Sequence, residues 1–192
     1  MRIRILVLLG LLCVQAPALR AQINAQMPAG PGAPAWDKGI LPISRDSYWN
    51  AVECGKQGGV RPACVFYDAD LCKNDDFTLA LYTPYKSVAY EVWRVLQNKQ
   101  PAPTPSYTEA QRTRVTIGVT PVAGSKNAIT GVLVKRGGKT IEPTARTVDA
   151  TGGKFTFDFT AFAPTSDITI ELAGRLRTLT CNVEQPVLTL FR

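Results

Sequence analysis

Residues 114–122 read RVTIGVTPV, and the spacing of their side chains decides the fold class. Val115, Ile117 and Val119 alternate with threonine and glycine. Successive side chains of a β-strand point to opposite faces of a sheet, so a period of two residues is typical of a strand with one buried face. The stretch therefore predicts a strand that packs valine and isoleucine inward and presents threonines outward.

The same alternation recurs along the C-terminal half of the chain. Its further strand-like stretches are KFTFDFTAF (154–162), with Phe155, Phe157 and Phe159 on one face, DITIEL (167–172) and RTLTCNV (177–183). The stretch GVLVKRGGKTIEP (131–143) predicts a hairpin, because Gly137 and Gly138 tolerate the positive φ of a tight turn. PVLTLFR (186–192) predicts a last edge strand, since Pro186 at its start needs no ladder hydrogen bond.

Together these patterns predict an antiparallel β-sandwich over residues 113–192. About six or seven short strands, each with one apolar face, are best accommodated by two sheets packed face to face. Either an immunoglobulin-like (Ig-like) or a transthyretin-like sandwich fits this pattern.

Residues 36–100 predict a smaller α+β unit that precedes the sandwich. Ser44 can cap a short helix, and Gly55 can end it. A strand over residues 77–82 then leads into a second helix, which Thr83 caps through its side chain.

The second helix carries an apolar stripe at helical spacing. The stripe comprises Tyr85, Val88, Ala89, Val92, Trp93 and Leu96. We expect it to pack against the β-sandwich; a groove for a partner or a membrane is the alternative. A Pro-rich linker over residues 101–112 separates this unit from the sandwich.

Residues 1–21 have the layout of a secretory signal peptide. Arg2 and Arg4 precede an apolar run from Ile5 to Val14, and small residues suited to cleavage follow. The run is too short to cross a bilayer as a helix. We therefore expect export to the periplasm or the extracellular space, a flexible Pro-, Gly- and Ala-rich leader over residues 22–35, and no transmembrane segment in the mature chain.

Four cysteines remain after the signal peptide: Cys54, Cys64, Cys72 and Cys181. An even number in an exported chain indicates disulfides, and the sequence allows three pairings. The short glycine-bearing loop favours Cys54–Cys64, and Cys72–Cys181 would then join the α+β unit to the sandwich. The chain has no histidine, which excludes Ser–His and Cys–His nucleophilic pairs and metal sites built on imidazole.

An acidic loop, CVFYDADLCKNDD (64–76), contains the carboxylates of Asp68, Asp70, Asp75 and Asp76. The spacing of an EF-hand calcium loop fails, because positions 5, 6 and 12 counted from Asp68 are Cys, Lys and Leu. The favoured interpretation is a structural loop, in which Asp and Asn cap turns and the cysteines tie the loop to its neighbours. The alternatives are looser calcium binding by Asp68, Asp70 and Asp75, and acid–base hydrolysis by two carboxylates across a cleft.

The charge of the chain argues against nucleic acid as a partner. Three of its 22 Lys and Arg residues lie in the signal peptide, so the mature chain, with 15 Asp and Glu, is only mildly basic. A nucleic-acid site is expected to show a basic stripe with interleaved aromatics, and the sequence has no such stripe.

The sequence thus predicts an exported, non-catalytic interaction or structural module of a bacterial cell envelope or secretome, with no catalytic residue, no cofactor and no metal. A protein or glycan partner would contact loops at the ends of the sandwich, Gly124–Asn127 and Ala163–Ser166. The alternatives are a carbohydrate-active or other hydrolase that uses carboxylates of the Asp68–Asp76 loop, and a calcium-binding module.

Overall fold

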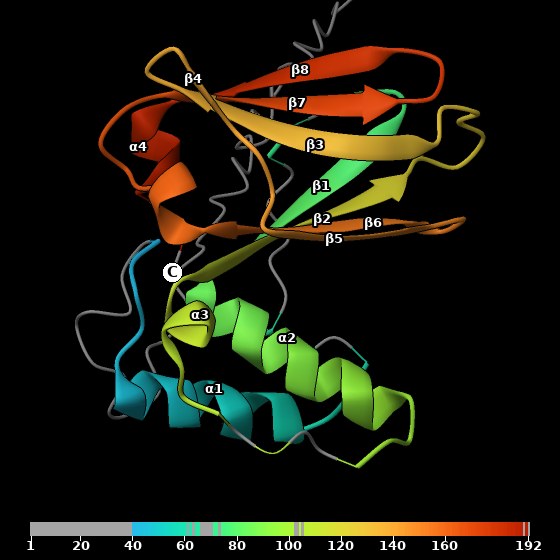
Figure 1. Ribbon diagram of the computed structural model, residues 1–192. Helices are drawn as coiled ribbons and strands as arrows, with labels where there is room; N and C mark the ends of the chain where they lie inside the picture. The colour runs from blue at the N-terminus through green and yellow to red at the C-terminus, as the bar shows by residue number, and fades with distance from the viewer. Residues whose placement is uncertain are drawn as a thin grey trace, which may run out of the picture.

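The computed structural model describes residues 40–60, 62, 64–65, 71–72, 74–101, 104, 106–189 and 191. Three layers follow one another (Figure 1): a four-stranded sheet, a second four-stranded sheet beneath it, and a layer of helices beneath that. The predicted signal peptide (1–21) and leader (22–35) lie outside the described residues, so both stay predictions.

Both sheets are antiparallel throughout. Sheet 1 contains, in spatial order, β1 (Phe77–Tyr82), β2 (Arg114–Pro121), β6 (Gly152–Asp158) and β5 (Ala145–Asp149). Sheet 2 contains β4 (Lys139–Ile141), β3 (Ile129–Arg136), β7 (Ile168–Gly174) and β8 (Thr178–Val183). The prediction of an α+β protein built on two packed antiparallel sheets is confirmed.

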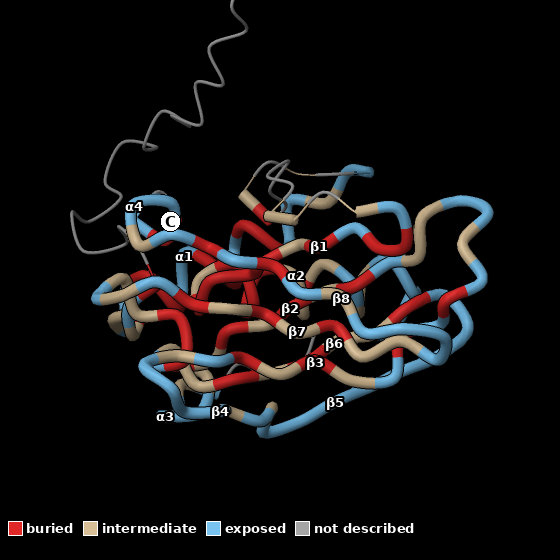
Figure 2. Tube along the Cα trace, turned by 90° about the horizontal axis from the view of Figure 1, so that it is seen from above, coloured by how far each residue is buried: buried red, intermediate tan, exposed pale blue. Residues whose placement is uncertain are grey.

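The main core lies between the two sheets, and alternation places the apolar side chains in it, so buried (red) and less buried segments follow one another along the strands in Figure 2. Val115, Ile117 and Val119 of β2 are buried there, while Thr116 and Thr120, at the alternate positions, lie on the outer face of sheet 1. The hairpin turn between β3 and β4 is also as predicted, because Gly137 and Gly138 both have positive φ. The edge strand β5 is exposed along its whole length.

One predicted strand segment ends earlier than the sequence pattern indicates. β6 stops at Asp158, whose carboxylate accepts a hydrogen bond from Thr160 N at 3.0 Å and starts the short 3-10 helix η2 (Phe159–Ala161). Phe159 is therefore only half-buried, unlike Phe155 and Phe157.

The predicted edge strand over residues 186–192 is wrong. The chain there forms the short helix α4 (Gln185–Leu188), in whose first turn the proline is tolerated because its missing N–H has no partner to lose. Leu188 and Phe191 reach the main core from this helix and its end. An apolar residue can thus be buried here without a strand pairing.

The strand β1 belongs to the sandwich, although a helix and the Pro-rich segment separate it from β2 in the sequence. Its residues pair with β2 from Phe77–Pro121 to Tyr82–Thr116. The alternation within residues 77–82 indicated a strand, but the pattern contains no information about which distant strand supplies its hydrogen bonds. Sheet 1 therefore includes a strand that the sequence assigned to the N-terminal unit.

The helical layer consists of α1 (Arg45–Lys56), α2 (Pro84–Gln97) and the short α3 (Glu109–Arg112) within the predicted linker. Both predicted N-caps are present: Ser44 accepts a hydrogen bond from Ser47 N and Thr83 accepts one from Lys86 N. Gly55 does not end α1. A Cβ atom at Gly55 would lie 2.5 Å from the backbone oxygen of Ala89, so the glycine permits close approach of α1 and α2.

The apolar stripe of α2 packs against α1, not against the sandwich as predicted. Val88, Ala89 and Val92 form a second buried cluster with apolar residues of α1, separate from the main core. The side of α2 that faces sheet 1 is polar: Ser87 Oγ donates to Tyr82 O at 3.0 Å and lies 3.3 Å from Thr116 Oγ1. Because α1 takes up the apolar stripe, the space between α2 and sheet 1 is lined by polar groups.

Candidate functional site

Both disulfides favoured by the sequence are present. Cys54 and Cys64 are joined at a Cα–Cα distance of 6.2 Å, and Cys72 and Cys181 at 5.8 Å. The second bond ties the loop before β1 to β8, the edge strand of sheet 2, across 109 residues of sequence. It therefore fastens the acidic loop to the sandwich.

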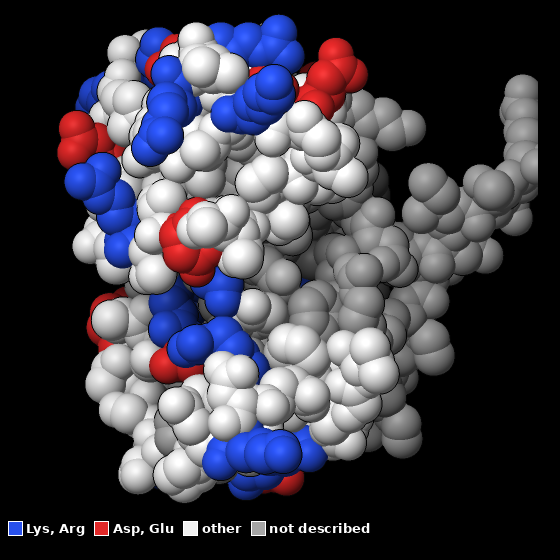
Figure 3. Space-filling model, turned by 90° about the vertical axis from the view of Figure 1, so that its right-hand side faces the viewer, with Lys and Arg blue, Asp and Glu red and all other residues white. Residues whose placement is uncertain are grey.

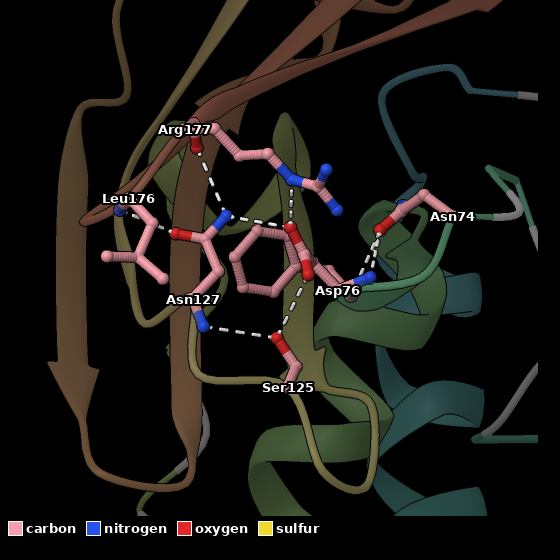
Figure 4. Close-up of polar contacts among 7 residues, drawn as sticks. Asn74, Asp76, Ser125, Asn127, Leu176 and Arg177 are labelled. Atoms are coloured by element: carbon pink, nitrogen blue, oxygen red, sulfur yellow. Dashed lines mark hydrogen bonds and ion pairs between the residues drawn. The ribbon is translucent and has the colours of Figure 1, made fainter.

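The last carboxylate of the acidic loop, Asp76, is the centre of a polar network (Figure 4). Its side chain is only 11 % exposed. Arg177 Nε and Asn127 Nδ2 donate to Asp76 Oδ2 at 2.7 and 2.9 Å, and Ser125 Oγ donates to Oδ1 at 3.1 Å. These partners come from the β2–β3 loop and the β7–β8 turn, so Asp76 holds three separate segments together at one end of the sandwich.

The network continues through Asn127, which is 2 % exposed. Its side chain accepts from Leu176 N at 2.9 Å and donates to Arg177 O at 3.1 Å. On the other side Asn74 accepts from the backbone N–H groups of Asp76 and Phe77, at 3.0 and 2.7 Å. These are the turn-capping contacts expected of Asn in a structural loop.

Of the remaining acidic candidates, the structure describes only Asp75. Asp68 and Asp70 lie outside the described residues, and Asp75 is exposed. Within the described part of the chain, no three His, Cys, Asp or Glu side chains gather as a metal ion would require. Calcium binding by Asp68, Asp70 and Asp75 stays an untested alternative.

The two loops expected to contact a partner lie at opposite ends of the sandwich, because β2 and β6, which precede them, are antiparallel. In Gly124–Asn127 the side chains of Ser125 and Asn127 are committed to Asp76. In Ala163–Ser166, Arg136 binds Thr165 and Ser166. Many of the polar side chains of both loops thus form hydrogen bonds within the protein, which leaves fewer of them to contact a partner.

The network around Asp76 predicts a loss of stability in acid. Hydrogen bonds from Arg177 and then Asn127 lower the pKa of Asp76 below its ordinary value. A lowered folded-state pKa stabilises the protein above the unfolded pKa of about 3.9, and this contribution is lost as the pH falls through the folded value. We expect urea unfolding between about pH 5 and pH 2 to show this loss, and Asp76→Asn to reduce the pH dependence.

Arg177→Gln provides the matched test of this coupling. It should weaken the same acid dependence, and adding it to Asp76→Asn should change little further, since the two residues share one interaction. Additive effects of the two substitutions on the pH dependence would contradict the coupling.

A large concave surface lies elsewhere, between α2 and the outer face of sheet 1. We call it the α2–sheet groove. It has a volume of about 970 Å³ and is lined by all four strands of sheet 1 and by one side of α2. Lys and Arg side chains gather in a hollow between the sandwich and the helices on the face shown in Figure 3. This size is at the upper end of the range for ligand sites in proteins.

The groove is rich in cations and hydroxyls. Its basic residues are Arg94, Arg114, Arg146 and Lys154, and its acidic residues are Glu91 and Asp149. Threonines from every strand of sheet 1 line it: Thr78, Thr116, Thr120, Thr147 and Thr156. Ala80 and Gly118, which are paired neighbours on β1 and β2, also line it, with the ring of Tyr82 beside Gly118.

Polar contacts set the charge that the groove presents. Glu91 Oε2 is 2.5 Å from Arg114 Nη2, so these two charges largely offset one another. Arg114 Nε is buried and has no hydrogen-bond acceptor among the described residues. Hydrogen bonds from the side chain and backbone of Thr151 lower the pKa of Asp149. The charge of Lys154 also lowers the pKa of Asp149, so these two charges offset one another in part, and the net positive charge of the groove comes from Arg94 and Lys154.

The aromatic side chains of the groove are already engaged. Lys154 Nζ lies 4.4 Å from the centroid of the Tyr90 ring and donates to Tyr90 Oη at 2.7 Å. Tyr90 also contacts Tyr82 and Trp93, with ring centroids 4.8 and 5.8 Å away. The Tyr90 ring thus serves mainly to position Lys154 in the groove.

Sequence analysis did not single out this groove. The alternation of β2 indicated outward threonines, and the residues of α2 that line the groove were visible only as polar positions on a helix. The sequence pattern did not indicate that α2 lies over sheet 1 with its polar side facing the sheet.

Comparisons with known proteins add no family to this description. No protein-family model matches the chain, and neither a curated protein nor a solved structure matches it significantly. None of the helices in the described part of the chain is long and apolar enough to span a membrane.

Proposed function

We propose that the protein is an exported, non-catalytic binding module and that the α2–sheet groove is its ligand site. The observation that carries this proposal is the groove itself: about 970 Å³, lined by hydroxyls and by cations that outnumber the carboxylates. The loops at the ends of the sandwich are less suited to this role, because much of their polar capacity is used internally. Export is supported by the two disulfides, which persist in oxidising compartments.

We further propose that the sandwich is Ig-like. The sheets of an Ig domain have the strand orders A-B-E-D and C-F-G, and some members add C′ beside C. Here β1-β2-β6-β5 corresponds to A-B-E-D and β4-β3-β7-β8 to C′-C-F-G. On this assignment α2 is an insertion between the first two strands, and it supplies one wall of the groove.

The carboxylates of the groove are less suited to hydrolysis. Glycoside hydrolysis needs one carboxyl group that keeps its proton at the working pH, hence a raised pKa. The pKa of Asp149 is lowered instead, and Glu91 is held by Arg114. Asp76 of the acidic loop has both of its oxygens in the network. These contacts favour binding over catalysis.

A steric plug tests the assignment of the groove. Thr147 is an exposed residue of β5 that lines the groove opposite Lys154, so Thr147→Trp should fill the groove without disturbing the core. Thr180→Trp is the matched control, because Thr180 is an exposed threonine of the edge strand β8 on sheet 2. Both variants should keep the melting temperature of the wild type, as most exposed substitutions do.

The assay is binding to an array of defined neutral and acidic oligosaccharides and peptides. We expect at least one ligand to bind the wild type and the Thr180→Trp variant, with a loss of ~10-fold or more in affinity for Thr147→Trp. Binding that Thr147→Trp leaves unchanged, or no binding by the wild type to any probe, would overturn the groove as the site. Shortening of an oligosaccharide by the wild type, seen by mass spectrometry and lost in Asp149→Asn, would overturn the non-catalytic assignment.

A further inference from the structure

The charges of the α2–sheet groove indicate the chemistry of its ligand. Among the described residues, neither Arg94 nor Lys154 forms an ion pair within 4.0 Å with a carboxylate, so neither charge has a direct carboxylate partner. Arg146 pairs with Phe155 of the main core, so its side chain leaves sheet 1 on the face opposite to the groove. Cations without a carboxylate partner favour a ligand with negative charges and acceptor oxygens.

The shape of the groove distinguishes between the classes of anionic ligand. Bases of a nucleic acid bind by stacking on open aromatic faces. Tyr90 has Lys154 over its ring and two aromatic neighbours, so this platform is occupied. A peptide would be specified by pockets for apolar side chains. The sheet side of the groove is lined mainly by threonines, with Ala80, Gly118 and the ring of Tyr82, so few large apolar side chains are available to form such pockets.

Hydroxyl groups are the remaining feature. A threonine hydroxyl both donates and accepts, as the hydroxyls of a sugar do. The threonines of the groove come from all four strands, which span about 14 Å at the usual strand spacing. That breadth accommodates several linked sugar rings.

We propose that the α2–sheet groove binds a carboxylated polysaccharide, a polymer of uronic acids, which crosses the four strands of sheet 1. Its carboxylates lie toward Arg94 and Lys154, and its hydroxyls toward the threonines of the sheet. This inference rests on the proposed function, because it specifies the ligand of the same groove.

The test uses the mature, oxidised protein and oligogalacturonate as the probe, in a titration by calorimetry. The matched neutral probe is the same oligomer with its carboxylates methyl-esterified. We expect the esterified oligomer to bind at least ~10-fold more weakly, since hydrogen bonds to charged groups are the stronger ones. Raising the salt concentration should weaken binding of the acidic oligomer, because exposed charges are screened.

Two double variants with the same change in net charge identify the residues. Arg94→Gln with Lys154→Gln removes two charges from the groove, and we expect a loss of ~10-fold or more in affinity for oligogalacturonate. Lys126→Gln with Lys139→Gln removes two exposed lysines outside the groove, and here a change within about twofold is expected. Melting temperatures check that both variants are folded.

The outcomes separate this inference from the proposed function. If poly-glutamate or an oligo-dT strand binds more tightly than oligogalacturonate, and Thr147→Trp still blocks binding, the proposed ligand class is wrong but the groove remains the binding site. The same holds if only neutral oligosaccharides bind in a manner that Thr147→Trp abolishes. If oligogalacturonate binds equally to the wild type, Thr147→Trp and the Arg94/Lys154 variant, both the ligand class and the groove are overturned.

Discussion

Replacing Cys72 and Cys181 together by alanine is expected to lower the free energy of unfolding by about 4–5 kcal/mol. The disulfide closes a loop across 109 residues of sequence, so its removal gives the unfolded chain a large gain in conformational entropy. In the folded protein the bond joins the loop before β1 to β8, the outermost strand of sheet 2. The acidic loop and this edge strand should therefore loosen together.

The measurement is urea unfolding of the oxidised protein, followed by tryptophan fluorescence and circular dichroism. The matched variant is Cys54→Ala with Cys64→Ala, which opens a loop with a separation of only 10 residues and should cost about 3 kcal/mol at most. The variant without Cys72–Cys181 should also show the larger increase in the m-value, because its unfolded state exposes more surface. An equal or larger loss from the short disulfide would contradict the loop-length argument.

Replacing Phe157 by alanine is expected to lower the free energy of unfolding by about 3–5 kcal/mol. Phe157 of β6 is 1 % exposed and lies at the centre of the main core. Its ring meets that of Phe162 edge-to-face, with centroids 5.5 Å apart, and its backbone pairs with Val115 of β2. Close packing on all sides leaves little room for the core to collapse around the cavity.

Phe159→Ala is the control that separates the observed structure from the sequence pattern. The alternation in KFTFDFTAF placed Phe155, Phe157 and Phe159 together on the buried face. In the structure β6 ends before Phe159, which is only half-buried. Its replacement should therefore cost about 1–2 kcal/mol, less than that of Phe157. Equal losses at the two positions, measured by urea unfolding, would indicate that the strand continues through Phe159.

The local features of this protein could be predicted from the order of its residues. Alternation identified the strands and their buried faces, because the period of two is a property of the strand backbone itself. The caps at Ser44 and Thr83 were equally local, since each side chain reaches a backbone N–H three residues away. The disulfide pairs could be predicted for a related reason. The loop between Cys54 and Cys64 is short and easy to close, which favoured one of the three possible pairings.

The contacts that matter for the candidate site are between residues far apart in the sequence. Asp76 meets Asn127 and Arg177 at separations of 51 and 101 residues, and nothing in the acidic loop indicates those partners. Sequence analysis saw the four carboxylates as one group because they are neighbours in the chain. In the folded protein, the side chain of Asp76 links the β2–β3 loop to the β7–β8 turn.

The groove depends on the orientation of one helix. The periodicity of α2 showed that it has an apolar and a polar side, but two apolar surfaces, that of α1 and that of the sandwich, competed for the apolar side. Gly55 decides the outcome locally, since it lets α1 approach α2 closely enough to cover Val88, Ala89 and Val92. A local pattern states which side of an element must be buried, whereas only the packed chain determines what buries it. The polar side of α2 is left facing the threonines of sheet 1, and that long-range choice creates the groove.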